Sequence, residues 1–116
     1  MVTTVNSGEC IIIQVKEDNT SFPIGIAEAS MLPGEGIYYF NRLYVNPKYR
    51  KKEYGKRLLN TLLDYMDSIN TALCLDINPY GEMTYEQLKA FYMRYGFKEM
   101  VENRLLYKPG GRSEQI

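Results

Sequence analysis

The chain has 116 residues, of which 45% are hydrophobic and 24% charged, and its 14 lysines and arginines balance 14 aspartates and glutamates. This size and composition predict one globular domain with its own core and exclude a two-domain enzyme. Histidine is absent, which removes the commonest metal ligand and general base, so we expect no metal site and no Ser-His or Cys-His couple. The zero net charge argues against a protein whose main role is to hold nucleic acid.

The two cysteines, Cys10 and Cys74, each lie in an apolar run without partner spacing, which predicts two buried, reduced thiols. No stretch approaches the roughly 20 consecutive apolar residues that span a bilayer, and the N-terminal residues lack a basic segment followed by an apolar one. The sequence therefore predicts a cytoplasmic protein with no membrane partner.

Three strands are predicted in the first 45 residues of the chain. Residues 10–15 are rich in β-branched side chains and predict the first strand, and residues 22–31 predict the second. Residues 37–45 are rich in aromatic side chains and predict the third strand, which should stop at Asn46-Pro47 because proline ends the ladder. The segments 16–21 and 32–36 have the composition of turns, so the three strands should form an antiparallel meander.

Two helices and two further strands are predicted after this meander. Leucine and methionine recur at helical spacing over residues 54–69, which predicts a helix with its apolar face on the core. Residues 72–77 predict a buried strand. Thr84 and Gln87 have the spacing of a capping box, so a second helix should begin there and end at Gly96. Residues 98–108 predict a last strand, and residues 109–116 a flexible tail.

This order of elements predicts an α/β (α+β) sandwich, with a mixed sheet of about five strands and two main helices in a single domain over residues 1–108. A right-handed crossover connects residues 37–45 through the first helix to residues 72–77, so these two strands should be parallel and adjacent or nearly so. A ligand crevice is then expected at their carboxyl ends.

The segment between the third strand and the first helix carries the clearest signal for function. Six cations and one acid lie between Lys48 and Arg57. A helix start binds anions because its first amides lack intrahelical partners and the helix dipole is positive there, and a pyrophosphate suits such a site. Neither Gly-x-x-x-x-Gly-Lys-Ser/Thr nor Gly-x-Gly-x-x-Gly occurs, so a nucleotide triphosphatase and a dinucleotide-binding fold are not supported.

Three segments, in order, resemble the acyl-CoA-binding region of the GCN5-related N-acetyltransferase (GNAT) superfamily. Leu43-Tyr44-Val45 ends a strand, the segment from Arg50 to Gly55 resembles Arg/Gln-x-x-Gly-x-Gly/Ala, and Tyr92-Met-Arg-Tyr-Gly-Phe97 resembles the helix end Tyr-x-x-x-Gly-Phe. The resemblance extends over residues 38–97, about half of the chain. It implies a GNAT-like fold with an acyl-CoA crevice at a splayed strand pair.

By this resemblance, the protein is an N-acetyltransferase that moves an acetyl group from acetyl-CoA to a primary amine by direct attack in a ternary complex. The amine belongs to a small molecule or to a protein lysine or N-terminus. The resemblance implies that Tyr92 is catalytic, because it stands where the family commonly has a tyrosine that protonates the departing coenzyme A thiolate. The implied cofactor-binding residues lie at the strand end and in the basic turn, and they are Leu43, Tyr44, Val45, Arg50, Lys51, Lys52, Glu53, Tyr54, Gly55 and Lys56.

The sequence departs from the family pattern at three positions. Glu53 stands where the first glycine of the motif is usual, Tyr85 where an asparagine is frequent, and Tyr39 where several members place a glutamate base. Deprotonation of the amine would then fall to Glu28, to Asp76 or to a water relay. The N-terminal region is too short for the two helices that usually cover the acceptor, which predicts an open site for a protein or peptide amine, or one completed by a partner chain, as in a homodimer.

Two other functions are compatible with the sequence. One is a non-catalytic GNAT-fold binding or inhibitory module, suggested by Glu53 and by the absence of a carboxylate on the strand; small members of the superfamily include phage-encoded antagonists of host defence. The other, less favoured, is a basic-patch RNA-binding protein in which residues 50–57 contact phosphates and Tyr38, Tyr39 and Tyr44 stack on bases.

Overall fold

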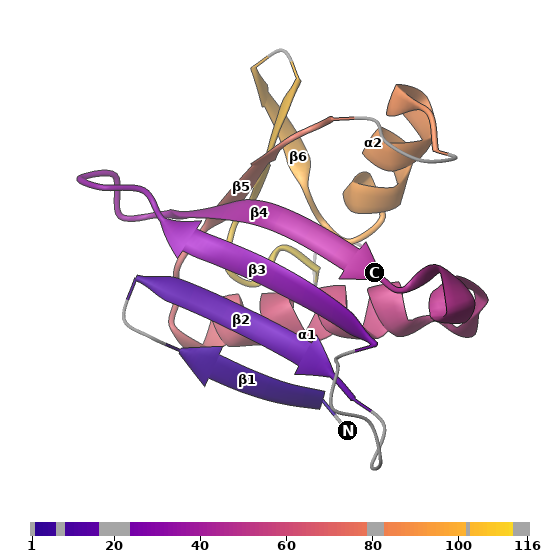
Figure 1. The fold of residues 1–116 in the computed structure, drawn as a ribbon. Helices are drawn as coiled ribbons and strands as arrows, with labels where there is room; N and C mark the ends of the chain where they lie inside the picture. Colours follow the sequence, from indigo (N-terminus) through magenta and orange to yellow (C-terminus); the bar gives the residue numbers. More distant parts are fainter. Residues whose placement is uncertain (1, 7–8, 17–23, 79–82, 102, 113–116) are drawn as a thin grey trace.

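The computed structural model describes residues 2–6, 9–16, 24–78, 83–101 and 103–112 (Figure 1). A seven-stranded mixed sheet has the order β1-β2-β3-β4-β5-β7-β6. Its strands are β1 (Val2–Asn6), β2 (Cys10–Val15), β3 (Gly25–Met31), β4 (Tyr38–Val45), β5 (Leu73–Asp76), β6 (Lys98–Val101) and β7 (Arg104–Tyr107). A 3-10 helix η1 (Pro47–Lys52), helix α1 (Tyr54–Ser68) and helix α2 (Tyr85–Met93) complete the described elements.

The α/β architecture with two main helices is confirmed, and β4 and β5 are parallel neighbours as predicted. The sheet is wider than expected for two reasons. Strand β1 was not predicted, and it pairs antiparallel with β2 along its whole length. The single strand predicted over residues 98–108 is a hairpin of β6 and β7, in which Asn103 adopts a left-handed conformation with φ 65°.

Helix α1 covers the face of the sheet formed by β2, β3 and β4 (Figure 1). Five of the six residues of its predicted apolar stripe are buried, namely Leu58, Leu59, Leu62, Leu63 and Met66. The sixth, Ile69, is exposed because the helix ends at Ser68 and Ile69 is its C-cap. Gly25 lets the start of the helix come close to the sheet, because a Cβ there would lie 2.9 Å from Leu58 Cδ1 and 2.9 Å from the carbonyl oxygen of Tyr44. The first turn of α1 is thus held beside the end of β4.

Helix α2 begins at the capping box that the sequence predicts. The Thr84 hydroxyl accepts a hydrogen bond from the Gln87 N–H at 3.2 Å, and the Gln87 side chain accepts one from the Thr84 N–H at 2.9 Å. The helix ends at Met93, before the predicted end at Gly96, and the chain then turns through Gly96, whose φ of 97° suits glycine. Within the described ranges, neither α1 nor α2 is long and apolar enough to cross a lipid bilayer.

The first part of the predicted flexible tail contacts α1 instead of extending into solvent. We call residues 108–112 the C-terminal strap. The Gly110 N–H and the Tyr107 hydroxyl donate to Asp67 Oδ1 at 2.8 and 2.7 Å, and the Arg112 guanidinium contacts Asp64 and Asp67 at 2.6 and 2.8 Å. These charged contacts offset the entropy that ordering a chain end costs. Residues 113–116 lie outside the described part of the chain.

Candidate functional site

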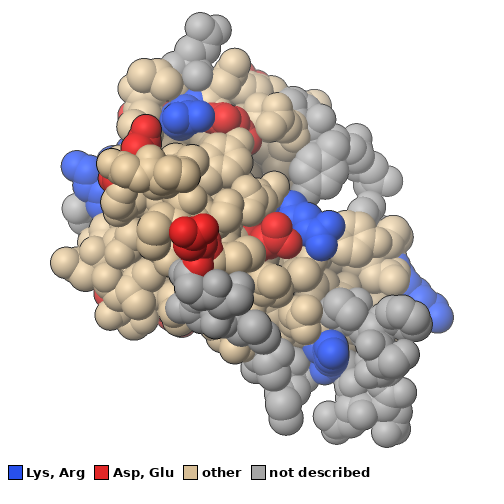
Figure 2. All heavy atoms as spheres, turned by 60° about the vertical axis from the view of Figure 1, so that its left-hand side comes forward, with Lys and Arg blue, Asp and Glu red and all other residues tan. Residues whose placement is uncertain are grey.

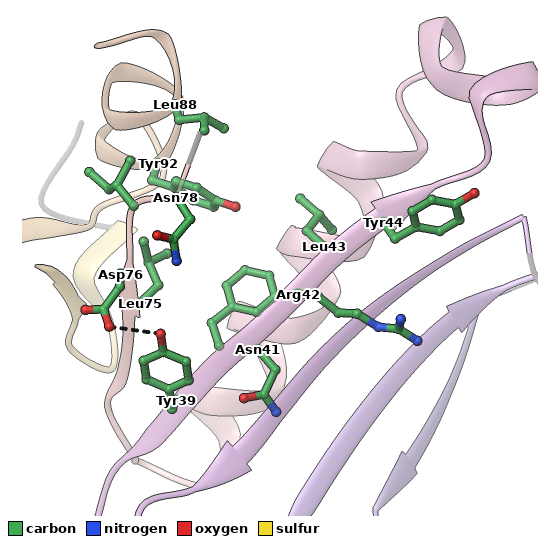
Figure 3. Close-up of a pocket in the computed structure, with 12 residues that line it drawn as sticks. Tyr39, Asn41, Arg42, Leu43, Tyr44, Leu75, Asp76, Asn78, Leu88 and Tyr92 are labelled. Atoms are coloured by element: carbon green, nitrogen blue, oxygen red, sulfur yellow. Dashed lines mark hydrogen bonds between the residues drawn. The ribbon is translucent and has the colours of Figure 1, made fainter. Parts of the chain in front are cut away.

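Strands β4 and β5 separate soon after they pair. Their ladder consists of Tyr38 opposite Leu73 and Tyr39 opposite Cys74. On its other side, β4 carries a bulge at Asn41, because Glu28 pairs with Arg42 whereas Ala29 pairs with Phe40. A bulge bends and twists its strand. The second half of β4 therefore turns away from β5, and the predicted crevice opens between them (Figure 3).

The crevice holds a cavity of about 280 Å³. Three elements contribute to its walls: β4, the end of β5 with the two residues that follow it, and α2. The lining residues are Tyr39, Phe40, Asn41, Arg42, Leu43, Tyr44, Leu75, Asp76, Ile77, Asn78, Leu88 and Tyr92.

Tyr92 reaches the cavity from α2, and its hydroxyl points toward the space between the two strands (Figure 3). Its ring makes edge contacts with Phe40, Phe91 and Phe97 at centroid distances of 6.2, 5.2 and 5.5 Å. Aromatic packing of this kind fixes the plane of a ring while leaving its polar end available. The residue that the resemblance implies as catalytic is thus held at the cavity wall.

The predicted strand-end residues divide between the cavity and the core. Leu43 and Tyr44 line the cavity, whereas Val45 packs against the hydrophobic core. Beyond it, the Asn46 side chain accepts a hydrogen bond from the Lys48 N–H at 3.0 Å and starts η1. The backbone of residues 50–52 lies in η1, and the side chains of these three cations fall outside the described part of the structure.

The backbone conformation at the junction of η1 and α1 explains why the acyl-CoA-binding motif usually has glycine at the position that Glu53 occupies here. Glu53 adopts φ 63° and ψ 17°, a left-handed conformation that costs an L-residue about 1–2 kcal/mol and glycine almost nothing. Its carboxylate lies 3.4 Å from Lys56 Nζ in the first turn of α1. A negative charge therefore occupies the helix start at which the sequence predicts a bound anion.

Tyr54 and Gly55 form the first two positions of α1. The Tyr54 ring meets that of Tyr49 edge-on at 6.0 Å, and the Arg57 guanidinium lies 5.5 Å from the Tyr54 ring centroid. A Cβ at Gly55 would make only an ordinary contact, 3.8 Å from Val45. The packing of the described residues therefore does not require glycine at this position.

On the β5 side, Tyr39, Asp76 and Arg104 form a hydrogen-bonded cluster. The Tyr39 hydroxyl donates to Asp76 Oδ2 at 3.0 Å, and Arg104 donates to both carboxylate oxygens at 2.7 and 3.2 Å. The Arg104 hydrogen bonds hold the pKa of Asp76 below its ordinary value, while burial and then the hydrogen bond to Asp76 raise the pKa of Tyr39. A lowered pKa makes Asp76 a weaker base, and both of its carboxylate oxygens already accept hydrogen bonds, which argues against it as the base.

The sequence reasoning did not single out Arg104. The signal that could have found it is the cross-strand register, which places Arg104 directly opposite Asp76 on the neighbouring strand. Glu28, another alternative for the base, lies on β3 and is not among the cavity-lining residues. Its carboxylate is 3.9 Å from Arg42 and 3.5 Å from the Asn41 amide.

The model of the acetyltransferase (GNAT) family matches residues 3–97 of this chain. The chain belongs to the GNAT family. Among curated proteins, none matches the sequence significantly.

Solved structures show the same GNAT fold at low sequence identity. The ribosomal-protein-S18-alanine N-acetyltransferase of Escherichia coli is similar at 14% identity with a TM-score of 0.71, over 90% of this chain and 72% of that one. The PaiA N-acetyltransferase of Thermoplasma acidophilum, in complex with coenzyme A, is similar at 22% identity with a TM-score of 0.65, over 86% of this chain and 61% of that one. The anti-CRISPR protein AcrVA5 is similar at 15% identity with a TM-score of 0.62, over 84% of this chain and 98% of that one.

We expect Glu53→Gly to raise the free energy of unfolding by about 1 kcal/mol, because the left-handed strain is relieved and an exposed ion pair contributes little. Removing the carboxylate should also tighten coenzyme A binding by about fivefold, since a like charge beside pyrophosphate costs about 1 kcal/mol. Urea unfolding and calorimetric titration measure the two effects. Asn70→Gly is the control, because Asn70 also has a positive φ, 52°, but lies at the far end of α1; it should leave affinity unchanged. Weaker binding by Glu53→Gly would contradict the expectation.

Proposed function

We propose that this GNAT protein transfers an acetyl group from acetyl-CoA to a primary amine by direct attack in a ternary complex. The observation that carries the proposal is the cavity between the diverging strands β4 and β5, with Tyr92 on one wall and the start of α1 just beyond the end of β4. The relative from Thermoplasma acidophilum, which holds coenzyme A, supports acyl-CoA as the donor.

The chain offers separate contacts for the two halves of coenzyme A. Past Tyr39, the ladder with β5 has ended, so an extended pantetheine arm can lie along β4 near Leu43 and Tyr44 much as a further strand would. The pyrophosphate would lie at the first turn of α1, near the amides of Tyr54 and Gly55. Arg50, Lys51, Lys52 and Lys56 would supply the positive charge.

The amine nitrogen attacks the thioester carbon, so a C–N bond forms and the C–S bond breaks. Tyr92 gives its hydroxyl proton to the departing thiolate, a contribution worth ~100-fold or more for a well-placed acid. The nitrogen loses its extra proton to water, and the tyrosine recovers its own proton from solvent. Both reactants are held in one cavity, which removes the entropic cost of bringing them together.

The overall charge balance favours an amine acceptor over a nucleic acid. The formal net charge is zero, and on the side of the molecule seen in Figure 2 the Lys and Arg atoms are interspersed with Asp and Glu atoms and uncharged surface. Cys74 is a buried free thiol as predicted, whereas Cys10, at the first position of β2, is a free thiol that is only partly buried. We place the activity in the cytoplasm, where thiols stay reduced.

Calorimetric titration with acetyl-CoA tests the proposal. We expect saturable binding by the wild type and a loss of at least about tenfold in the Arg50→Ala, Lys56→Ala double variant, since charge-assisted hydrogen bonds to phosphate contribute about 1.5–3 kcal/mol. The matched control is Arg94→Ala, Lys108→Ala, which removes two exposed cations that the proposal does not place near the cofactor. Equal losses in both double variants would contradict the proposed pyrophosphate site.

A second candidate is a non-catalytic binding or inhibitory module of the same fold. The Glu53 carboxylate at the start of α1 favours it, and the similar anti-CRISPR protein is a compact chain that is matched over 98% of its length. This candidate predicts that the wild type binds acetyl-CoA poorly in the same titration, or binds it without transferring the acetyl group to an amine.

A further inference from the structure

Three neighbouring strands bring one polar side chain each to the edge of the cavity. Tyr39 comes from β4, Asp76 from β5 and Arg104 from β7, and the last two are direct cross-strand partners. Tyr39 and Asp76 both line the cavity, and Figure 3 shows the hydrogen bond between them. Asp76 and Arg104 are about two-thirds buried, with side-chain exposures of 34% and 36%.

The hydrogen bonds of this cluster determine whether the Tyr39 hydroxyl can donate or accept a hydrogen bond in the cavity. An ionised carboxylate only accepts hydrogen bonds, and a phenol has one hydrogen to give. Two hydrogen bonds from Arg104 fix the Asp76 carboxylate, so the single hydrogen of Tyr39 is committed to Asp76 and is not available to another group in the cavity. The Tyr39 oxygen therefore offers the cavity only its lone pairs, and it can only accept.

We propose that Tyr39 accepts a hydrogen bond from the N–H of the acceptor amine, and that Asp76 and Arg104 are positioning residues that hold its hydroxyl in this orientation. The inference rests on the proposed function and deepens it. A nitrogen held through one N–H keeps its own lone pair for the thioester carbon. The C–N bond forms, the C–S bond breaks, and the proton released by the nitrogen goes to water, so Tyr39 neither gains nor loses a proton.

The inference is tested by binding, with no need for turnover, using two analogues that join coenzyme A to a model acceptor. In one, the sulfur carries CH2–CO–NH–butyl, and in the other CH2–CO–O–butyl, which lacks the N–H. Calorimetry gives the Kd of each analogue and of coenzyme A. The wild type should bind the amide about tenfold more tightly than the ester, because the ester leaves the Tyr39 oxygen without its donor.

The variant Tyr39→Phe should reduce this preference to about twofold or less while its Kd for coenzyme A stays at the wild-type value. Asp76→Asn should also lower the preference, because an asparagine amide group no longer fixes the Tyr39 hydrogen. Tyr95→Phe is the control; it removes a hydroxyl from the turn that follows α2, where the Tyr95 ring packs on Phe91 at 5.3 Å, and it should keep the full preference.

An amide preference that Tyr39→Phe leaves intact would overturn the inference and leave the proposed function standing, since coenzyme A would still bind. A wild-type protein that binds neither coenzyme A nor the analogues would overturn the proposed function and this inference with it. Circular dichroism and a thermal midpoint for each variant confirm that the proteins compared are folded.

Discussion

Replacing Tyr92 with phenylalanine should lower kcat for acetyl transfer by ~100-fold or more, while the Kd for acetyl-CoA changes less than about twofold. The substitution keeps the ring, whose edge contacts with Phe40, Phe91 and Phe97 hold this part of α2. Only the hydroxyl that faces the cavity is lost. The thiolate then leaves without a proton donor, and the transition state becomes less stable while the ground state is little affected.

Release of the coenzyme A thiol, followed with a disulfide reagent and n-butylamine as the acceptor, measures this effect. Tyr95→Phe serves as the control, because it removes a hydroxyl just past the end of the same helix, at a residue that is not among those lining the cavity. A Tyr92→Phe variant with wild-type kcat would show that the thiolate leaves without help from this residue.

Asp67→Ala should lower the free energy of unfolding by about 3 kcal/mol, because three donors lose a charged acceptor at once. These donors are the Gly110 N–H, the Tyr107 hydroxyl and the Arg112 guanidinium. Tyr107 is fully buried, so its hydroxyl has little access to water as a replacement. Urea unfolding measures the loss, and Asp64→Ala is the matched control: its side chain is 71% exposed and contacts Arg112 alone among these groups, so its effect should be below about 1 kcal/mol.

The contribution of Asp67 should depend on pH. Burial by itself would raise the pKa of this carboxyl, but hydrogen bonds from Gly110, Tyr107 and Arg112 outweigh it and lower the pKa. A lowered pKa means that the stability is present above the unfolded value of about 4 and is lost as the pH falls through the folded value. The difference between wild type and Asp67→Ala should therefore shrink in acid. A difference that is the same at neutral and at strongly acidic pH would show that the ionised carboxylate is not its source.

The helices and the order of the main strands were predictable because their signals are local. The apolar stripe of α1, the capping box of α2 and the proline after β4 are each formed by residues that lie close together in the sequence. Strand β1 was missed because residues 2–6 carry only a short run of valine and threonine, and their strand conformation depends on pairing with β2. The β6–β7 hairpin was read as one strand because its turn depends on the left-handed Asn103.

The same distinction applies to the site. The motifs placed Leu43, Tyr44 and Tyr92 at the cavity because each lies near the end of a strand or helix that the sequence identifies. The contacts of Arg104 with Asp76 and of Arg112 with Asp67 join residues 28 and 45 positions apart. Such contacts depend on strand register and on where the chain end packs, and neither is visible in a local pattern.

The short ladder between β4 and β5 has a mechanical consequence. With two residue pairs in the middle of the sheet, β4 and β5 are joined by the shortest ladder among the described strands. The Asp67 contacts with Tyr107 and with the C-terminal strap supply a second connection, because they tie α1, which packs on β2 to β4, to β7 and the residues after it. The separation of β4 and β5 at the cavity therefore depends in part on residues that do not line it.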